Sequence, residues 1–208
     1  MNIYRKPVIF ALAAAAVISV GTLVTTFIPV FMPSMTPVME GIKPYNPLQL
    51  EGRDIYVREG CNNCHTQTVR PLKAEMARYG DYSRISEFTY DRPFLWGSKR
   101  TGPDLARVGG KYPDSWHYRH MKDPQAMFAK SNMPSYAWLA DRPLDTTYTE
   151  RKMKTLGFPY SPDDLKSLQG KNEMDALVAY LQKLGRDFKE LSKKTATASG
   201  KQQEGYHD

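Results

Sequence analysis

The sequence predicts a mainly α-helical protein in which one N-terminal transmembrane helix is followed by a single globular domain. Three observations predict this fold class. Residues 8–32 form an apolar run, later segments repeat apolar residues at helical spacing, and no strand–helix–strand pattern surrounds the cysteines. With 208 residues, the chain is long enough for one domain with a sizeable core.

The N-terminal run is long enough to cross a membrane. No charged residue occurs between Pro7 and Met39, and the stretch 8–32 exceeds the roughly 20 residues that span a bilayer. A cleaved signal peptide is the alternative, because Arg5 and Lys6 precede an Ala-rich run, but the apolar region of such a peptide usually has about 7–15 residues. We therefore expect an uncleaved anchor. Its basic N-terminal end predicts a cytoplasmic N-terminus, with the rest of the chain in the periplasm, outside a bacterial inner membrane.

Proline content and polarity divide the chain into four parts. We expect a cytoplasmic N-terminus and transmembrane helix over 1–32, a Pro-rich tether over 33–47, a periplasmic domain over 48–188 and a polar, disordered tail over 189–208.

Several helices are expected inside the domain. Asn46 and Pro47 are typical of a helix start, and that helix continues toward residue 57. Further helices are expected over 71–79, over 114–121, from Ser161 to Gly170, and from Asn172 to Gly185, the last packing on the first. The stretches 81–101 and 137–160 show no sustained period and are expected to be loops.

Both cysteines of the chain lie in the motif Cys61-Asn62-Asn63-Cys64-His65. Two thiols at this spacing, followed directly by a histidine, are typical of c-type haem attachment, in which the sulfurs bond to the vinyl groups and the imidazole binds iron. No other thiol remains for a Cys-rich zinc site or a disulfide framework. A thioredoxin-like redox pair would require a βαβ pattern around it. The motif therefore predicts one covalent haem c, held by Cys61 and Cys64, with His65 as an iron ligand.

A methionine is the expected iron ligand on the opposite face of the haem. Met133 lies in a loop fixed by Pro134, and a thioether opposite an imidazole raises the reduction potential. Met121 and Met127 are its nearest rivals, and His120 could replace it. Met133 could also serve only in packing, as most methionines do.

Two histidines lie three residues apart on the helix expected over 114–121. His117 and His120 could in principle bind a second metal. Because no cysteine or carboxylate pair is nearby in the sequence, we expect polar surface or interface positions for both.

The charge of the chain favours some partners and excludes others. Its formal net charge is +7, with 29 Lys and Arg against 22 Asp and Glu. This balance favours an acidic protein partner or an anionic membrane surface. The basic residues are spread along the chain and form no stripe suited to a phosphate backbone, so nucleic-acid binding is not expected.

The order of helix, CxxCH motif, Gly-Pro turn, helix, Met-Pro loop and C-terminal helix resembles the class I cytochrome c fold. The resemblance implies that His65 and Met133 bind iron from opposite faces, and that the Pro103 carbonyl holds the His65 ring. The stretch between His65 and Gly102 is longer than in a compact cytochrome c. Its many aromatic residues suggest a docking surface.

Three longer strings resemble one family much more specifically. CNNCHTQTVRP, DRPFLWGSKRTGPDLARVGGKY and NMPSY, after one anchor, closely resemble the mono-haem cytochrome c subunit of cbb3-type cytochrome c oxidase, the FixO family. The resemblance implies three protein partners, namely a catalytic subunit with haem b and a haem–copper centre, a di-haem cytochrome c subunit, and a soluble cytochrome c. The resemblance also implies electron transfer within a proton-translocating terminal oxidase. Oxygen reduction would then belong to the catalytic subunit, and the loop from Trp96 to Arg100 would face that subunit.

Three other functions stay open from the residues alone. A membrane-anchored shuttle cytochrome would need no fixed partner. A peroxidase-type enzyme would use an iron position left open if Met133 were not a ligand. A structural anchor would carry a haem that plays no part in turnover.

Overall fold

The computed structural model describes residues 6–32, 34–35, 37–91 and 93–194. The chain divides into two compact units between Met39 and Glu40. The regular structure of both units is helical, and the described residues contain no β-strand. The predicted mainly α-helical fold with an N-terminal apolar helix is therefore confirmed.

The first unit is one long apolar helix. It consists of α1 (Pro7–Thr22), a widened turn over Leu23–Phe27, and α2 (Ile28–Val30). The stretch Pro7–Val30 has 24 residues, an 18-residue window within it has a mean hydropathy of 2.4, and no residue of that window is buried. Pro29 lacks a backbone N–H, which explains a disturbed hydrogen-bond pattern in the turn before it. This helix is long and apolar enough to cross a membrane.

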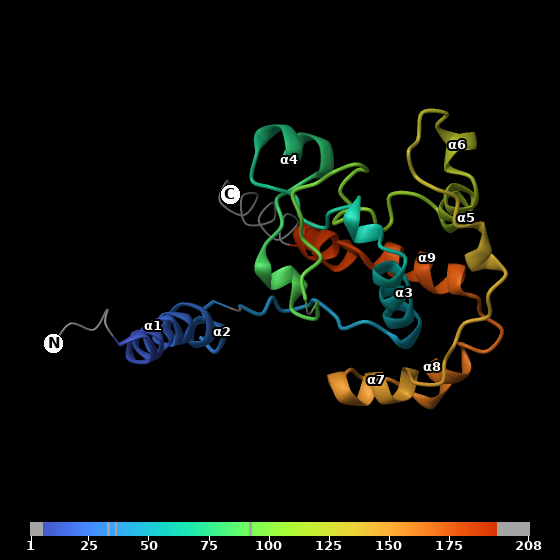
Figure 1. Cartoon of the computed structure of the whole chain (residues 1–208). Coiled ribbons are helices and arrows are strands. Elements are labelled where there is room, and N and C mark those ends of the chain that lie inside the picture. The colour runs from blue at the N-terminus through green and yellow to red at the C-terminus, as the bar shows by residue number, and fades with distance from the viewer. Residues whose placement is uncertain (1–5, 33, 36, 92, 195–208) are drawn as a thin grey trace, which may run out of the picture. The chain divides into compact units, whose positions relative to one another are not determined.

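The second unit is built on the crossing of α3 (Pro47–Arg58) and α9 (Glu173–Lys183), which lie at its centre in Figure 1. The two helices meet at Gly52, where a Cβ atom would stand 1.9 Å from the carbonyl oxygen of Ala176. Beside this contact the Tyr56 and Tyr180 rings lie 5.3 Å apart, and both side chains are fully buried. The expected packing of the last helix on the first is confirmed.

Local sequence explains where these two helices begin and end. Asn46 and Gln49 form a reciprocal capping box at the start of α3, with Pro47 in the first turn. Asn172 and Asp175 do the same for α9. Gly60 follows α3 in the left-handed conformation, with φ of 70°, which glycine adopts without steric cost. The chain therefore turns sharply at the residue before Cys61.

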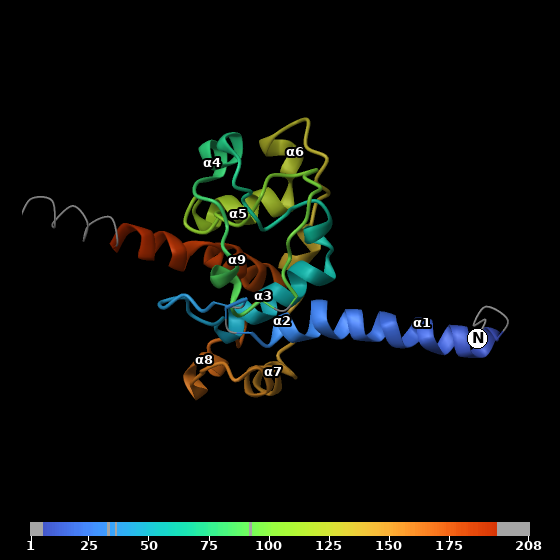
Figure 2. The same ribbon diagram turned by 90° about the vertical axis from the view of Figure 1, so that its left-hand side faces the viewer.

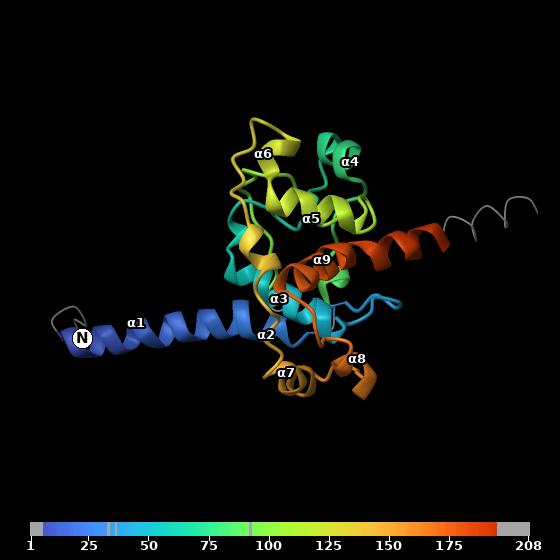
Figure 3. The ribbon, with the colours of Figure 1, turned by 90° about the vertical axis from the view of Figure 1, so that its right-hand side faces the viewer.

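Shorter elements surround the crossing. Figures 2 and 3 show α4, α5 and α6 on one side of α3 and α9, with α7 and α8 on the other. The bounds are α4 (Lys73–Tyr79), α5 (Asp114–Lys122), α6 (Pro124–Met127), α7 (Thr149–Leu156) and α8 (Pro162–Lys166), with single 3₁₀ turns η3 (Cys61–Asn63), η4 (Ile85–Phe88) and η5 (Ala137–Ala140).

The expectation of a loop over 137–160 is wrong for its second half, because residues 149–156 form α7. This helix is tied to α3 by polar contacts that lie far apart in sequence. Thr149 Oγ1 donates to Glu51 at 2.6 Å, and Lys152 Nζ donates to Glu51 and Asp54 at 2.7 Å each. Met153 is fully buried, so tertiary contacts stabilise a helix that its short, charged sequence did not indicate.

Both ends of the second unit contribute to its packing. No helix forms over 37–46, but Tyr45 is buried and its hydroxyl donates to the Asp91 carboxylate at 2.9 Å. Residues 186–194 are helical, and Phe188 is buried. The remainder of the predicted tail, 195–208, lies outside the described residues.

Candidate haem site

The Cys61–His65 motif forms one tight turn directly after α3. The backbone N–H of His65 donates to the Cys61 carbonyl at 2.9 Å, and both cysteines are free thiols, with Cys61 half-buried and Cys64 exposed. Burial raises the pKa of the Cys61 thiol to about 12, which keeps this thiol protonated. Two sulfurs and an imidazole are thus presented within five consecutive residues.

The His65 ring is oriented by the turn that contains Pro103. Its Nδ1 lies 2.8 Å from the Pro103 carbonyl oxygen. Because a carbonyl only accepts, a neutral ring in this contact carries its proton on Nδ1 and leaves the lone pair on Nε2 free. Burial lowers the pKa of His65, which favours the neutral form that can bind a metal. The predicted neighbourhood of Pro103 and His65 is present in the structure.

Glycine at position 102 makes room for this ring. A Cβ atom there would stand 2.2 Å from His65 Cε1, closer than any side chain tolerates. Two backbone hydrogen bonds hold the turn against the motif, from Gly102 N to the Cys64 carbonyl at 3.0 Å and from Leu105 N to the Thr66 carbonyl at 2.9 Å. The segments 64–66 and 102–105 therefore form one unit around the imidazole.

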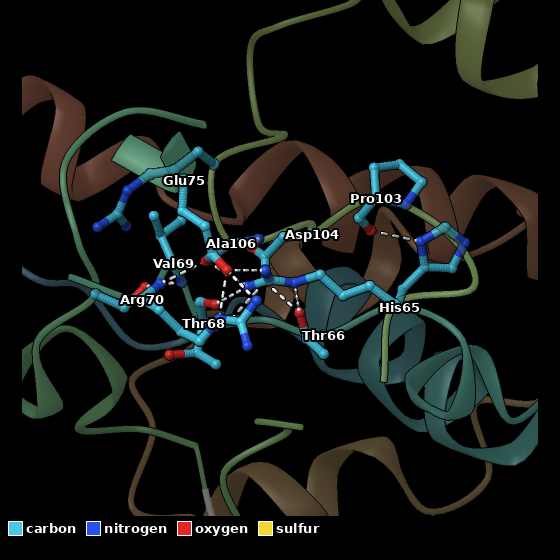
Figure 4. Close-up of polar contacts among 12 residues, drawn as sticks. His65, Thr66, Thr68, Val69, Arg70, Glu75, Pro103, Asp104 and Ala106 are labelled. Atoms are coloured by element: carbon cyan, nitrogen blue, oxygen red, sulfur yellow. Dashed lines mark hydrogen bonds and ion pairs between the residues drawn. The ribbon is translucent and has the colours of Figure 1, made fainter. Parts of the chain in front are cut away.

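A polar network lies beside His65 and Pro103 (Figure 4). The Asp104 carboxylate accepts from the Thr66 hydroxyl, and from the backbone N–H groups of Thr68 and Ala106 at 2.9 Å each. Arg100 donates to Thr66 Oγ1 at 3.0 Å and to Glu75 Oε2 at 2.7 Å. Sequence reasoning missed this network. The string RTGPDL contains Arg100 and Asp104, but nothing in it indicates their pairing with residues 66–75.

Met133 lies on a loop that is held by hydrogen bonds to α5 and α6. Gln125 Nε2 donates to the Met133 carbonyl at 2.7 Å, and Tyr136 N donates to the Met121 carbonyl at 2.8 Å. The Met133 side chain is half-buried and packs against the same core as Cys61. Of its two rival methionines, Met121 is buried in that core and Met127 is half-buried at the end of α6.

The expected surface position is wrong for His117, which is 1% exposed on α5. His120, one turn further along, stacks on Trp116 with ring centroids 4.7 Å apart. His117 Nε2 and His120 Nδ1 are buried and have no hydrogen-bond partner in the described part of the chain. Burial lowers the pKa of both rings, and a positive charge on His65 would lower that of His120 further. His120 therefore lies within electrostatic reach of His65.

The residues present fit a haem. The motif and the turn at Pro103 combine two free thiols, an imidazole with its Nε2 lone pair free and a glycine that clears space beside the imidazole. The Met133 thioether packs against the same core as Cys61. The unpartnered nitrogen of His120 is a polar atom that a group bound near His65 can satisfy. Among the described residues, no three His, Cys, Asp or Glu side chains gather as a metal-ion site.

Comparison with known families identifies the chain. The family model described as cytochrome c oxidase, mono-haem subunit/FixO, matches residues 1–172. The chain belongs to the FixO family. The FixO match includes the apolar helix, the Cys61–His65 motif, the turn at Pro103 and the Met133 loop. Membership in this FixO family implies one haem, a role in electron transport and a catalytic oxidase partner. No curated protein matches the chain.

Proposed function

We propose that this chain is the membrane-anchored, mono-haem electron-transfer subunit of a cbb3-type cytochrome c oxidase. The observation that carries the proposal is the arrangement around His65, whose ring is fixed through Nδ1 by Pro103 while both thiols lie in the same turn. Membership in the FixO family supplies the oxidase context. The single helix Pro7–Val30 supplies the means of anchoring.

Four side chains would hold the haem. The sulfurs of Cys61 and Cys64 would attach it covalently, and His65 Nε2 and the Met133 thioether would bind its iron. When bound, the haem supplies a one-electron redox centre with the high potential that Met ligation favours. The protein contributes orientation, because the Pro103 carbonyl fixes the imidazole plane and Gly102 permits the close approach.

Aromatic residues of the 81–101 insertion support a docking role. The Phe94 and Trp96 rings stack with centroids 4.9 Å apart, and the buried Phe88 ring packs edge-on against Trp96 at 5.3 Å. Trp96 is nevertheless 37% exposed. A rigid aromatic pair with one exposed member suits an interface, because little conformational freedom is lost when a partner covers it. We place the catalytic subunit, with its haem b and copper centre, on this side of the chain.

The remaining partners and the topology belong to the same proposal. A di-haem cytochrome c subunit completes the complex, and a soluble cytochrome c acts as an electron donor. The basic residues Arg5 and Lys6, at the N-terminal end of the apolar helix, support a cytoplasmic N-terminus and a periplasmic haem domain in a bacterial inner membrane. Oxygen reduction and proton movement fall to the catalytic subunit, because this anchor is uncharged from Pro7 to Val30.

Purification in mild detergent tests this proposal. A tag on this chain is expected to bring down companion subunits, and the reduced-minus-oxidised spectrum is expected to show b-type haem beside c-type haem. Haem staining after denaturing electrophoresis should mark this chain. A stable monomer that carries covalent haem without companions would contradict the oxidase assignment and favour the shuttle cytochrome.

A further inference from the structure

The side chain of Asp104 is completely buried, one residue after the proline that orients His65. One carboxylate oxygen accepts from the Thr66 hydroxyl and from Thr68 N, and the other accepts from Ala106 N. Three hydrogen-bond donors thus surround this carboxylate. An acidic side chain is therefore held at the turn whose carbonyl contacts the imidazole.

Arg100 interacts with the carboxylate of Asp104 and also with a second carboxylate, that of Glu75. Its Nη2 stands 3.5 Å from Asp104 Oδ2, and its side chain is 14% exposed. The guanidinium also forms a two-pronged contact with Glu75 and donates to the Thr68 carbonyl at 2.8 Å. Through Nε it donates to Thr66 Oγ1 at 3.0 Å, and Thr66 in turn donates to Asp104. The two charges are therefore coupled both directly and through one hydroxyl.

Two buried charges of opposite sign shift the reduction potential of a neighbouring redox group in opposite directions. The oxidised state of a haem carries one more positive charge than the reduced state, so a buried carboxylate favours the oxidised form and a buried guanidinium favours the reduced form. Solvent screens these interactions weakly where the groups are buried.

We propose that Asp104 and Arg100 are positioning residues that set the reduction potential of the haem bound by His65. Asp104 lowers the potential, and Arg100 raises it while fixing Thr66 and Asp104 in place. The inference rests on the proposed function, since it needs a haem at His65.

A second buried ion pair in the same unit provides a matched control. Arg107 and Glu87 have side chains that are 6% and 4% exposed, and they form a two-pronged contact. The other contacts of Arg107 are with the carbonyls of Asp81 and Tyr82 and the ring of Phe188. None of these groups contacts His65 or Pro103, so this pair has the same chemistry without the link to the iron ligand.

The test is a redox titration of the full-length, haem-loaded chain in detergent, followed through its visible spectrum. Asp104→Asn is expected to raise the midpoint potential, and Arg100→Gln is expected to lower it. Arg100→Lys keeps the positive charge but loses the two-pronged contact of the guanidinium. Its midpoint potential should therefore lie between those of Arg100→Gln and the wild type. Glu87→Gln should lower thermal stability while leaving the potential unchanged. A general loss of stability does not account for shifts of the midpoint potential in opposite directions in Asp104→Asn and Arg100→Gln.

Several outcomes would overturn the inference. These are an unchanged or lowered potential in Asp104→Asn, shifts of equal sign in Asp104→Asn and Arg100→Gln, or a comparable shift in Glu87→Gln. If Arg100→Gln does not fold, the sign of the shift in Asp104→Asn still decides. A wild-type chain without covalent haem would instead defeat the proposed function, and haem staining distinguishes that failure before any titration.

Discussion

Gly102 lies directly against the ring of His65, so that a Cβ atom at this position would stand 2.2 Å from Cε1 and 2.7 Å from both ring nitrogens. The contact explains why the turn before Pro103 can approach the imidazole closely enough for a 2.8 Å hydrogen bond. The backbone of one segment thereby fixes the side chain of another.

Gly102→Ala is expected to displace the His65 ring and to break its hydrogen bond to Pro103. Overpacking at a close contact of this kind costs about 1–3 kcal/mol, and the misplaced imidazole should lower haem content or shift the visible spectrum. Haem content per chain and the thermal midpoint Tm measure both effects. Gly97→Ala is the control, because its Cβ would meet only Thr66 Cγ2 at 3.4 Å. Equal behaviour of the two variants would contradict the role of Gly102.

Met133→Ala should open the iron to added ligands. The reduced wild-type chain is expected not to bind carbon monoxide, because His65 and Met133 would both bind the iron, whereas the variant should bind it. The measurement is the change in the visible spectrum on adding carbon monoxide. Binding by the wild type would contradict the assignment of Met133.

His120 gives the Met133 experiment a second arm. If Met133→Ala still does not bind carbon monoxide, His120 is the replacement ligand that we expect, because its Nδ1 has no hydrogen-bond partner among the described residues. Combining Met133→Ala with His120→Ala should then open the site, while combining it with His117→Ala should not. If Met133→Ala binds carbon monoxide without a second substitution, His120 is not an iron ligand in that variant.

Stability below neutral pH is expected to depend on Glu75. Hydrogen bonds from Arg100 lower the pKa of this carboxyl from an ordinary value of 4.5 to about 2. A depressed pKa in the folded state contributes stability that is fully present above about pH 4.5 and is lost as the pH falls toward 2. Glu75→Gln should therefore reduce the free energy of unfolding by about 1–2 kcal/mol at pH 7, with the difference shrinking toward pH 2.

Urea unfolding at a series of pH values measures this dependence. Glu150→Gln is the control, because Glu150 and Lys154 form an exposed ion pair whose attraction is screened by solvent. A constant difference between Glu75→Gln and the wild type across the whole pH range would contradict the role of the carboxylate charge.

Gly52→Ala should be among the most destabilising small substitutions in the domain. The added methyl group would stand 1.9 Å from the Ala176 carbonyl and 2.8 Å from Tyr180 Cβ, which forces α3 and α9 apart. We expect a loss of about 3 kcal/mol or more in the free energy of unfolding. Val57→Ala, at an exposed position of the same helix, should cost far less. A Tm equal to that of the wild type in Gly52→Ala would contradict the close contact of α3 with α9 at this position.

The sequence predicted those elements whose signals are local. Asn46 with Pro47, and Asn172 with Gly185, indicated the two central helices, and the uncharged run after Lys6 indicated the apolar helix. Within the site, the turn from Cys61 to His65 is one continuous motif. Its contact with Pro103 came from the resemblance to cytochromes c, because the intervening residues give no local sign of where the chain returns.

Features that depend on distant residues could not be predicted in this way. Helix α7 is held by the bonds from Thr149 and Lys152 to Glu51 on α3, and its eight residues include only two large apolar side chains, Met153 and Leu156. His117 lies in a charged stretch that is typical of a surface, yet α5 turns its ring inward. The pairing of Arg100 with Glu75 likewise joins segments that only the folded chain brings together.

The central claim is that one haem is covalently attached to this chain through Cys61 and Cys64. Mass spectrometry of the intact, denatured chain tests it most directly, after expression in a bacterium that attaches haem in its periplasm. The wild type should have the mass of the polypeptide plus one haem, and a variant with both cysteines replaced by serine should have the polypeptide mass alone. A wild-type chain without the added mass, or a double variant that keeps it, would contradict the account.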